Sequence, residues 1–108
     1  MARWYYWVES NCTDPAREEE YNAWYDKTHL PDILETQGFA KATRYALKEN
    51  VEGRGKYLAV YEIETEDLDA VLAAHQQNMR QKARAGRISD LVSVTGRGMY
   101  KQISSYPE

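Results

Sequence analysis

The spacing of apolar and polar residues along the chain predicts four strands and two helices in the order β-α-β-β-α-β. The first strand is the aromatic run from Trp4 to Ser10, which ends at a turn-prone segment. Its rings occupy odd and even positions, and successive side chains of a strand point to opposite faces of the sheet. Both faces of this strand are therefore expected to be covered, one by helices and the other by a second copy of the chain.

The first helix is predicted from its capping residues. Asp14 and Pro15 mark its start, because aspartate caps helices and proline suits their first turn. Pro31 disfavours helical geometry at the residue before it, so this helix is predicted to end close to His29. Asp32 is then expected to cap a separate, short helical turn.

The remaining elements follow from the same kind of pattern. Residues 39–47 and 57–63 predict two strands joined by a glycine-containing turn, with Phe39 and Tyr45 on one face of the first. A second helix is expected from residues 66–69 to about Arg84, followed by a strand over residues 91–103. Gly96 and Gly98 in that strand indicate a bulge or a close backbone approach.

This order predicts an α+β fold for the whole chain, residues 1–108, as a single domain. The fold is a ferredoxin-like βαββαβ antiparallel sheet with both helices on one face.

Composition narrows the possible partners. Nine Tyr and three Trp against one Phe suit interfaces and wet cavities, because these rings combine apolar area with a polar tip. A net charge of -3 offers no basic surface for nucleic acid. Cys12 is the single cysteine, no Cys/His spacing resembles a zinc site, and no apolar run is long enough to span a membrane. A soluble, cytoplasmic protein is expected.

One segment carries a family resemblance. The pattern E-Y-N-x-W-Y-D-x-x-H-L-P-D-I-L-x-x-x-G-F from Glu20 to Phe39, followed by A-T-R-Y at residues 42–45, resembles the dimeric α+β barrel superfamily. Within that superfamily the segment is most similar to EthD-like and uncharacterised stand-alone proteins, in which W-Y-D-x-x-H-L-P ends the first helix. The likeness extends over roughly residues 4–103.

The resemblance implies a homodimer whose two sheets pack face to face, with a small-molecule pocket in each subunit between its helices and its sheet. Members include cyclases, isomerases, dehydratases and monooxygenases, and many of them work without metal or organic cofactor. No cofactor is therefore expected here. Haem-degrading members carry their iron ligand on the second helix, where this chain has His75, but the chain lacks a clear match to their first-strand asparagine. A helical histidine followed by Gln76, Gln77 and Asn78 is expected to face solvent.

His29 is the leading catalytic candidate. Neutral imidazole abstracts a proton next to a carbonyl, imidazolium protonates a leaving oxygen, and an ordinary pKa near ~6.5 serves both roles. A structural alternative is that His29 caps the last carbonyls of its helix. Asp26, three residues earlier, is placed to orient the imidazole, or else is a solvated carboxylate.

Aromatic residues and one arginine complete the candidate site. Tyr21, Trp24 and Tyr25 lie on one helix face, where they either stack on an aromatic ligand or belong to the core. The strand residues Tyr6, Tyr45 and Tyr61 are candidates to present hydroxyls to a developing oxyanion. Arg44 is a candidate to hold a substrate acid, with pairing to Glu62 as the simpler alternative. The predicted catalytic set is His29, Tyr25, Tyr61 and Asp26, and the predicted substrate-binding set is Tyr6, Trp24, Arg44 and Tyr45.

Three functions remain open from the sequence. The preferred one is a cofactor-independent lyase, isomerase or cyclase that uses histidine acid-base chemistry on a small aromatic or polyketide-like carbonyl or alcohol. The alternatives are a cofactorless or haem-dependent monooxygenase and a non-catalytic dimer that binds a small molecule. The cations between Arg80 and Arg87 are expected to be a solvated face, or to attract an anionic substrate to the pocket mouth.

Overall fold

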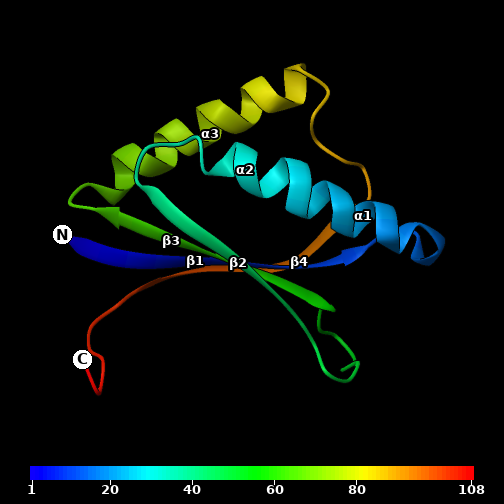
Figure 1. Cartoon of the computed structure of the whole chain (residues 1–108), viewed down its shortest axis with the longest axis horizontal. Helices are drawn as coiled ribbons and strands as arrows, with labels where there is room; N and C mark the ends of the chain where they lie inside the picture. The colour runs from blue at the N-terminus through cyan, green and yellow to red at the C-terminus, as the bar shows by residue number, and fades with distance from the viewer.

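The computed structural model describes residues 1–108 as a four-stranded antiparallel sheet with all helices on one of its faces (Figure 1). The strands are β1 (Ala2–Cys12), β2 (Phe39–Ala46), β3 (Tyr57–Thr65) and β4 (Val92–Lys101). Their order in the sheet is β2-β3-β1-β4. The predicted ferredoxin-like α+β fold is therefore confirmed.

Two long helical segments cover the sheet. The first is continuous and comprises a 3-10 turn (Pro15–Arg17), α1 (Glu18–Trp24), a π-helical stretch (Tyr25–His29) and α2 (Leu30–Ile33). The second is α3 (Leu68–Arg84), which Asp67 caps by accepting a hydrogen bond from the Ala70 N–H at 3.1 Å. Its last residue, Arg84, agrees with the predicted end at about this position. No helix in the chain is both long and apolar enough to cross a membrane.

The predicted end of the first helix near His29 is wrong. Leu30 keeps helical angles (φ -59°, ψ -48°), and its N–H donates to the carbonyl of Tyr25, five residues earlier. This π turn widens the helix just before Pro31, whose ring would collide with the carbonyl four residues back in a regular α-helix. Asp32 is therefore no cap of a separate turn; it lies inside α2 and is only 4% exposed.

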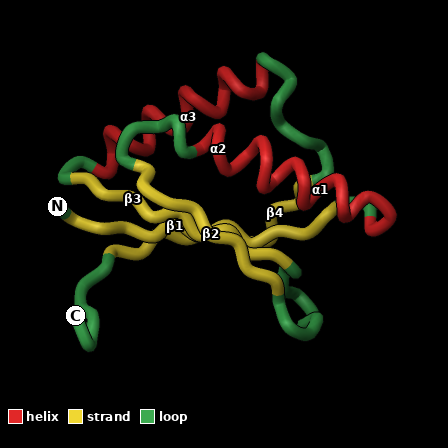
Figure 2. Tube along the Cα trace, in the orientation of Figure 1, coloured by secondary structure: helices red, strands yellow, loops and turns green.

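Figure 2 shows the helices above one face of the sheet. The buried core residues come from these helices and from the strands beneath them. The register places Tyr6 of β1 opposite Tyr61 of β3 and Met99 of β4. Because cross-strand partners share a face, these three side chains all point toward the helices. The fully buried side chains of the core include Tyr21, Tyr25, Tyr61, Ile63 and Leu91.

A bulge at the start of β2 changes which of its residues share a face. The pairing of β2 with β3 shifts between Phe39 and Lys41. Phe39 consequently joins Arg44 on the helix side of the sheet, where it packs against His75 at 5.1 Å between ring centroids. Tyr45 points to the other face and is 55% exposed. The predicted common face for Phe39 and Tyr45 is wrong, because one extra residue inverts the alternation.

The opposite face of the sheet carries aromatic side chains without a covering layer. Trp7 stacks on Tyr100, with 6.5 Å between ring centroids and 20° between the planes. The indole lies directly on Gly98, where an added Cβ would meet its Cε2 at 2.5 Å. The predicted close approach at this glycine is confirmed. The β2–β3 hairpin and the C-terminal tail project past this face at opposite ends of the sheet (Figure 1).

Candidate functional site

The π turn brings three rings of the first helix together. The imidazole of His29 stacks on the indole of Trp24, with 4.5 Å between centroids and 21° between planes. It meets Tyr25 edge to face at 5.1 Å. Residues five apart do not face each other on an α-helix, whereas a π turn repeats close to that spacing. The stack of Trp24 on His29 therefore depends on the widened turn.

These rings form one wall of a cavity of about 360 Å³ beneath the helices. Most of its fourteen lining residues are hydrophobic. The other walls come from Tyr6 of β1, Tyr61 of β3, His75 and Met79 of α3, and residues of β4. An apolar cavity with a few convergent polar groups is the usual form of a small-molecule site. Four residues of the predicted site, Tyr6, Trp24, Tyr25 and Tyr61, thus meet at one cavity with His29.

The imidazole of His29 is held in its neutral form. Burial lowers its pKa from 6.5 to about 4, because the apolar cavity disfavours the charged ring, and the nearby Asp32 carboxylate offsets only part of this effect. Nδ1 of His29 is buried and has no hydrogen-bond partner in the chain. At neutral pH the ring can accept a proton, but the imidazolium needed to protonate a leaving oxygen is almost absent from the free protein. The double role expected from an ordinary pKa therefore does not fit the free protein, in which only proton acceptance by the neutral ring is available at neutral pH.

Tyr61 supplies a second unpartnered polar atom. Its side chain is 1% exposed, and its hydroxyl oxygen has no well-formed hydrogen bond. Burial, and then the neighbouring Tyr25 hydroxyl, hold the pKa of Tyr61 far above its ordinary value. Burial likewise raises the pKa of Tyr25. Tyr61 therefore stays protonated at every working pH and can donate a hydrogen bond to an oxygen inside the cavity.

His75 belongs to the cavity, contrary to the solvent-facing position expected from its neighbours in the sequence. Its ring packs against Phe39 and, edge to face at 6.2 Å, against Tyr6. Its Nδ1 is buried without a partner. Burial lowers the pKa of His75, and the positive charge of Arg97 lowers it further. Helical spacing from Leu68 was the signal that could have placed His75 on the buried face of α3.

Asp26 and Arg44 contact each other instead of the cavity. The Arg44 guanidinium donates to Asp26 Oδ1 at 3.0 Å and to Asn22 Oδ1 at 2.9 Å, and it lies 4.3 Å from the centre of the Tyr25 ring. Asp26 is therefore engaged away from His29, and Arg44 does not pair with Glu62. Cross-strand register is the reason, because Arg44 stands opposite Ala59, on the helix side of the sheet.

Two further residues fall outside the expected site. Tyr45 lies on the uncovered face, so it cannot present its hydroxyl to the cavity. Tyr21 is a core residue; its hydroxyl shares a 2.5 Å hydrogen bond with Ser10 Oγ. From the sequence alone, the ring of Tyr21 could belong either to the core or to a ligand-binding surface.

The loop between α3 and β4 closes one side of the cavity. Arg87 in this loop forms a bidentate ion pair with Asp32, with N–O distances of 2.7 and 3.0 Å. Its carbonyl also accepts a hydrogen bond from the Trp24 indole at 2.9 Å. The pair holds the pKa of Asp32 below its usual range. These contacts place Ile88 and Ser89 at the cavity, while the side chain of Arg87 itself stays 46% exposed, as expected of a solvated cation, although it is paired.

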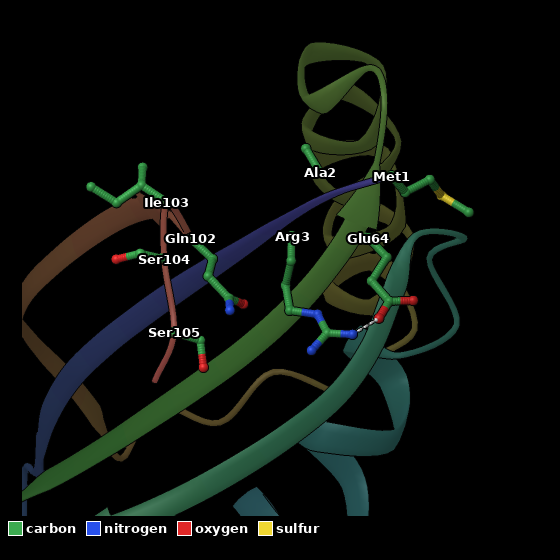
Figure 3. Close-up of a pocket in the computed structure, with 8 residues that line it drawn as sticks. All are labelled: Met1, Ala2, Arg3, Glu64, Gln102, Ile103, Ser104 and Ser105. Atoms are coloured by element: carbon green, nitrogen blue, oxygen red, sulfur yellow. Dashed lines mark hydrogen bonds and ion pairs between the residues drawn. The ribbon is translucent and has the colours of Figure 1, made fainter. Parts of the chain in front are cut away.

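A second hollow, of about 530 Å³, lies at the chain ends, between the N-terminal residues and the C-terminal tail (Figure 3). Its one charged pair, Arg3 with Glu64 at 2.5 Å, is mutually satisfied. Most of its lining is exposed and polar, and it contains no histidine, tyrosine or tryptophan. The cavity at His29 is the better candidate site. No group of three or more potential metal-ligating His, Cys, Asp or Glu side chains is gathered in the chain.

Comparison with known sequences gives a family and no activity. The family model described as "Domain of unknown function (DUF4286)" matches residues 4–99. No curated protein matches the sequence.

Comparison with solved structures supports the fold. SnoaB from Streptomyces nogalater, described as a cofactor-independent oxygenase, superposes with a TM-score of 0.64 over 100% of both chains at 13% identity. An EthD family protein from Bacillus halodurans gives a TM-score of 0.61 over 95% of this chain and 100% of that chain, at 11% identity. A dimeric ferredoxin-like protein of unknown function from Thermobifida fusca gives 0.57 over 94% and 90%, at 14% identity. The chain shares the ferredoxin-like α+β fold of these proteins.

Proposed function

We propose that this chain, which belongs to the DUF4286 family, is an enzyme that removes a proton from a small, largely apolar substrate by means of its own side chains. The observation that carries the proposal is a set of three unpartnered buried polar atoms in one apolar cavity: Nδ1 of His29, Nδ1 of His75 and the hydroxyl of Tyr61. Buried polar groups are normally hydrogen-bonded, so three orphaned groups in one cavity favour a bound molecule that satisfies them. The two that we assign to the reaction, His29 and Tyr61, lie where the W-Y-D-x-x-H-L-P segment faces the sheet.

Each of these residues has a distinct part in the proposed reaction. Neutral His29 takes a proton from an acidic C–H or O–H of the substrate, which leaves an enolate or phenolate. Tyr61 donates a hydrogen bond to the oxygen on which the negative charge develops. Trp24 and Tyr6 offer ring faces and edges to a flat substrate.

The fate of the anion decides the reaction class. Return of the proton to another carbon gives an isomerase, loss of a leaving group gives a lyase, and attack on a second carbonyl of the same molecule gives a cyclase. We prefer these classes because each needs nothing beyond the groups in the cavity. The structures of this fold also justify a second candidate, a cofactor-independent oxygenase like SnoaB. In that reaction the anion passes electrons to O₂, and a CH₂ group plus O₂ gives C=O plus H₂O.

Proton exchange provides a test that does not require the natural substrate. In D₂O the protein is expected to accelerate deuterium incorporation into flat carbon acids such as 2-tetralone, which NMR follows directly. Oxygen uptake with the same compounds separates the oxygenase from the lyase, isomerase and cyclase classes. A protein that bound these ketones but left their exchange at the buffer rate would be a non-catalytic binder, against the proposal. The haem-dependent version remains a prediction that a spectroscopic titration with hemin tests.

We further propose that the uncovered sheet face is the interface of a homodimer. Trp7, Tyr45 and Tyr100 place large rings on this face, and Tyr45 and Tyr100 are 55% and 63% exposed. Exposed apolar area of this kind usually marks a contact surface. Light scattering at micromolar concentration is expected to give the mass of a dimer.

Charge on that face is expected to break the dimer. The double variant Tyr45→Lys/Tyr100→Lys brings like charges together across a two-fold interface, so light scattering should give a monomer. Ala73→Lys, at an exposed position of α3 on the helix layer, is the matched control and should remain dimeric. A wild-type monomer, or a double variant that stays dimeric, would contradict this interface.

A further inference from the structure

The cavity at His29 continues into a groove between α3 and β4. The groove measures about 690 Å³, and it shares four lining residues with the cavity: Tyr6, His75, Met79 and Arg97. The two hollows are therefore neighbours that meet at these four side chains. A ligand long enough to occupy both would reach from His29 in the inner cavity to the groove between α3 and β4.

Two cations line the groove, of which Arg97 also lines the cavity, and no carboxylate lines either hollow. Arg97 stands opposite Val8 of β1, a core residue, which places it on the helix side of the sheet. Arg80 comes from α3 on the other side of the groove. The charged groups at the mouth of this apolar cavity are therefore all positive, which favours the binding of an anion.

Neither cation is neutralised within the chain. None of the eight ion pairs of the protein involves Arg80 or Arg97. Their neighbours differ, because Lys82 pairs with Glu35 at 2.7 Å and Arg87 pairs with Asp32. The two groove arginines thus keep their donors available for a ligand.

The inner end of the site requires a different chemical group on the ligand. The unpartnered Nδ1 atoms of His29 and His75 and the hydroxyl of Tyr61 require polar atoms on the ligand. Between the two ends the walls are mostly rings, methionine side chains and aliphatic groups. The complementary molecule is polar at its inner end, flat and apolar in its middle, and anionic at its outer end.

We infer that the substrate is an aromatic or similarly flat acid, whose carboxylate or equivalent anion is bound by Arg97 and Arg80 while its carbonyl or hydroxyl reaches His29 and Tyr61. This inference rests on the proposed function for the inner end of the site. The arginines act in binding and specificity, Arg97 from the point where the two hollows meet and Arg80 from the outer groove. Their guanidinium groups can each present two N–H donors to one carboxylate.

A matched pair of probes tests the inference. 6-Hydroxy-2-naphthoate and 6-hydroxy-2-naphthamide have the same ring system and phenol, and they differ only in charge at the far end. Calorimetric titration is expected to show the acid binding roughly tenfold tighter than the amide, the effect of one charge-assisted contact. Added salt should weaken binding of the acid and leave the amide unchanged, because these arginines are partly exposed to solvent.

Substitutions of the two arginines test whether they cause the preference for the acid over the amide. Arg97→Gln and Arg80→Gln should each reduce the preference for the acid several-fold, and the double variant should abolish it, with affinity for the amide retained as evidence of an intact cavity. Arg84→Gln, on the same helix but outside both hollows and without an ion pair, is the control and should keep the full preference. Equal affinity for the two probes, no saturable binding of the acid at millimolar concentration, or a preference that survives in the double variant would overturn the inference.

The test separates this inference from the proposed function. His29→Gln should retain the preference for the acid, because the anion binds at the other end of the site. If the protein prefers the acid but does not catalyse proton exchange, the anion site is supported and the proposed reaction is contradicted. If the protein catalyses exchange but binds both probes equally, the reaction is supported and the anion site is contradicted.

Discussion

Replacing His29 with glutamine is expected to lower the rate of enzyme-catalysed proton exchange by roughly 10²- to 10⁴-fold, the usual contribution of a positioned general base. Glutamine has a similar polar reach but no basic atom at neutral pH. Two groups in the cavity can take the proton: the neutral imidazole of His29 and that of His75, which lies on the opposite wall. NMR measurement of deuterium incorporation for the two proteins, at equal concentration and pH, checks the expected loss.

The control for this experiment is Asp26→Asn. The structure engages Asp26 with Arg44. Exchange in Asp26→Asn should therefore stay within about twofold of the wild type. Full exchange in His29→Gln would exclude His29 as the base. A large loss in Asp26→Asn with an intact fold would restore the orienting role expected from the sequence.

The pH dependence of exchange follows from the same buried ring. The free protein's His29 has a pKa lowered to about 4, so its basic form persists down to mildly acidic pH. The kcat/KM for exchange should stay level from pH 8 to about pH 5 and fall only below that. A fall centred near the ordinary pKa of histidine would indicate that the reacting histidine is exposed to solvent.

His29→Gln is also expected to make the protein more resistant to mild acid, by up to about 3 kcal/mol. The pKa of His29 is lowered from 6.5 to about 4 in the folded chain. Between these two pH values the unfolded chain binds a proton that the folded chain does not, so the free energy of unfolding rises with pH. Stability is therefore complete above about pH 6.5 and is lost progressively as the pH falls toward 4. Glutamine has no such proton.

Urea unfolding at a series of pH values from 7 to 4.5 measures this effect, at one fixed protein concentration because a dimer would make stability depend on concentration. His75→Gln is the comparison, since the pKa of His75 is also lowered by burial and contributes a slope of the same sign. The buried carboxylate of Asp32 has a lowered pKa and adds its own loss mainly below this window. Equal slopes in His29→Gln and the wild type would mean that His29 is solvated in the folded protein.

The exchange and stability predictions for His29 have the same physical origin. A neutral imidazole without a hydrogen-bond partner in an apolar cavity lowers stability in acid, while the same isolation keeps it available to a substrate. Functional sites commonly retain such unsatisfied groups at the expense of stability.

Local patterns in the sequence were sufficient for the order of elements and for most of their ends. Strand alternation, the Asp14–Pro15 helix start and the length of α3 depend on a few neighbouring residues, so they could be predicted without the fold. The presence of a histidine beside aromatic rings in the first helix was also evident. Position along one helix is enough to bring Tyr25 and His29 close.

The face of the sheet to which a strand residue points depends on the strand register, and local sequence patterns do not determine that register. The bulge at Phe39 moved Tyr45 to the uncovered face, and pairing with β3 directed Arg44 toward Asp26. A single extra residue inverts every later side chain of a strand, so counting from the wrong start reverses the prediction. The same limit applied to His75, whose neighbours in the sequence are polar although its contacts in the fold are not.

By itself the sequence determined the βαββαβ order of elements and a candidate catalytic segment from Tyr21 to Pro31, because helix caps, strand alternation and ring spacing are local properties. Only the tertiary structure decided that the helix continues through a π turn, that His29 stacks on Trp24, and that Tyr61, His75 and Arg97 join it from separate elements. The physical reason is that burial and the loss of solvent around an imidazole arise from residues distant in the chain. The lowered pKa of His29, about 4, is therefore a property of the packed molecule.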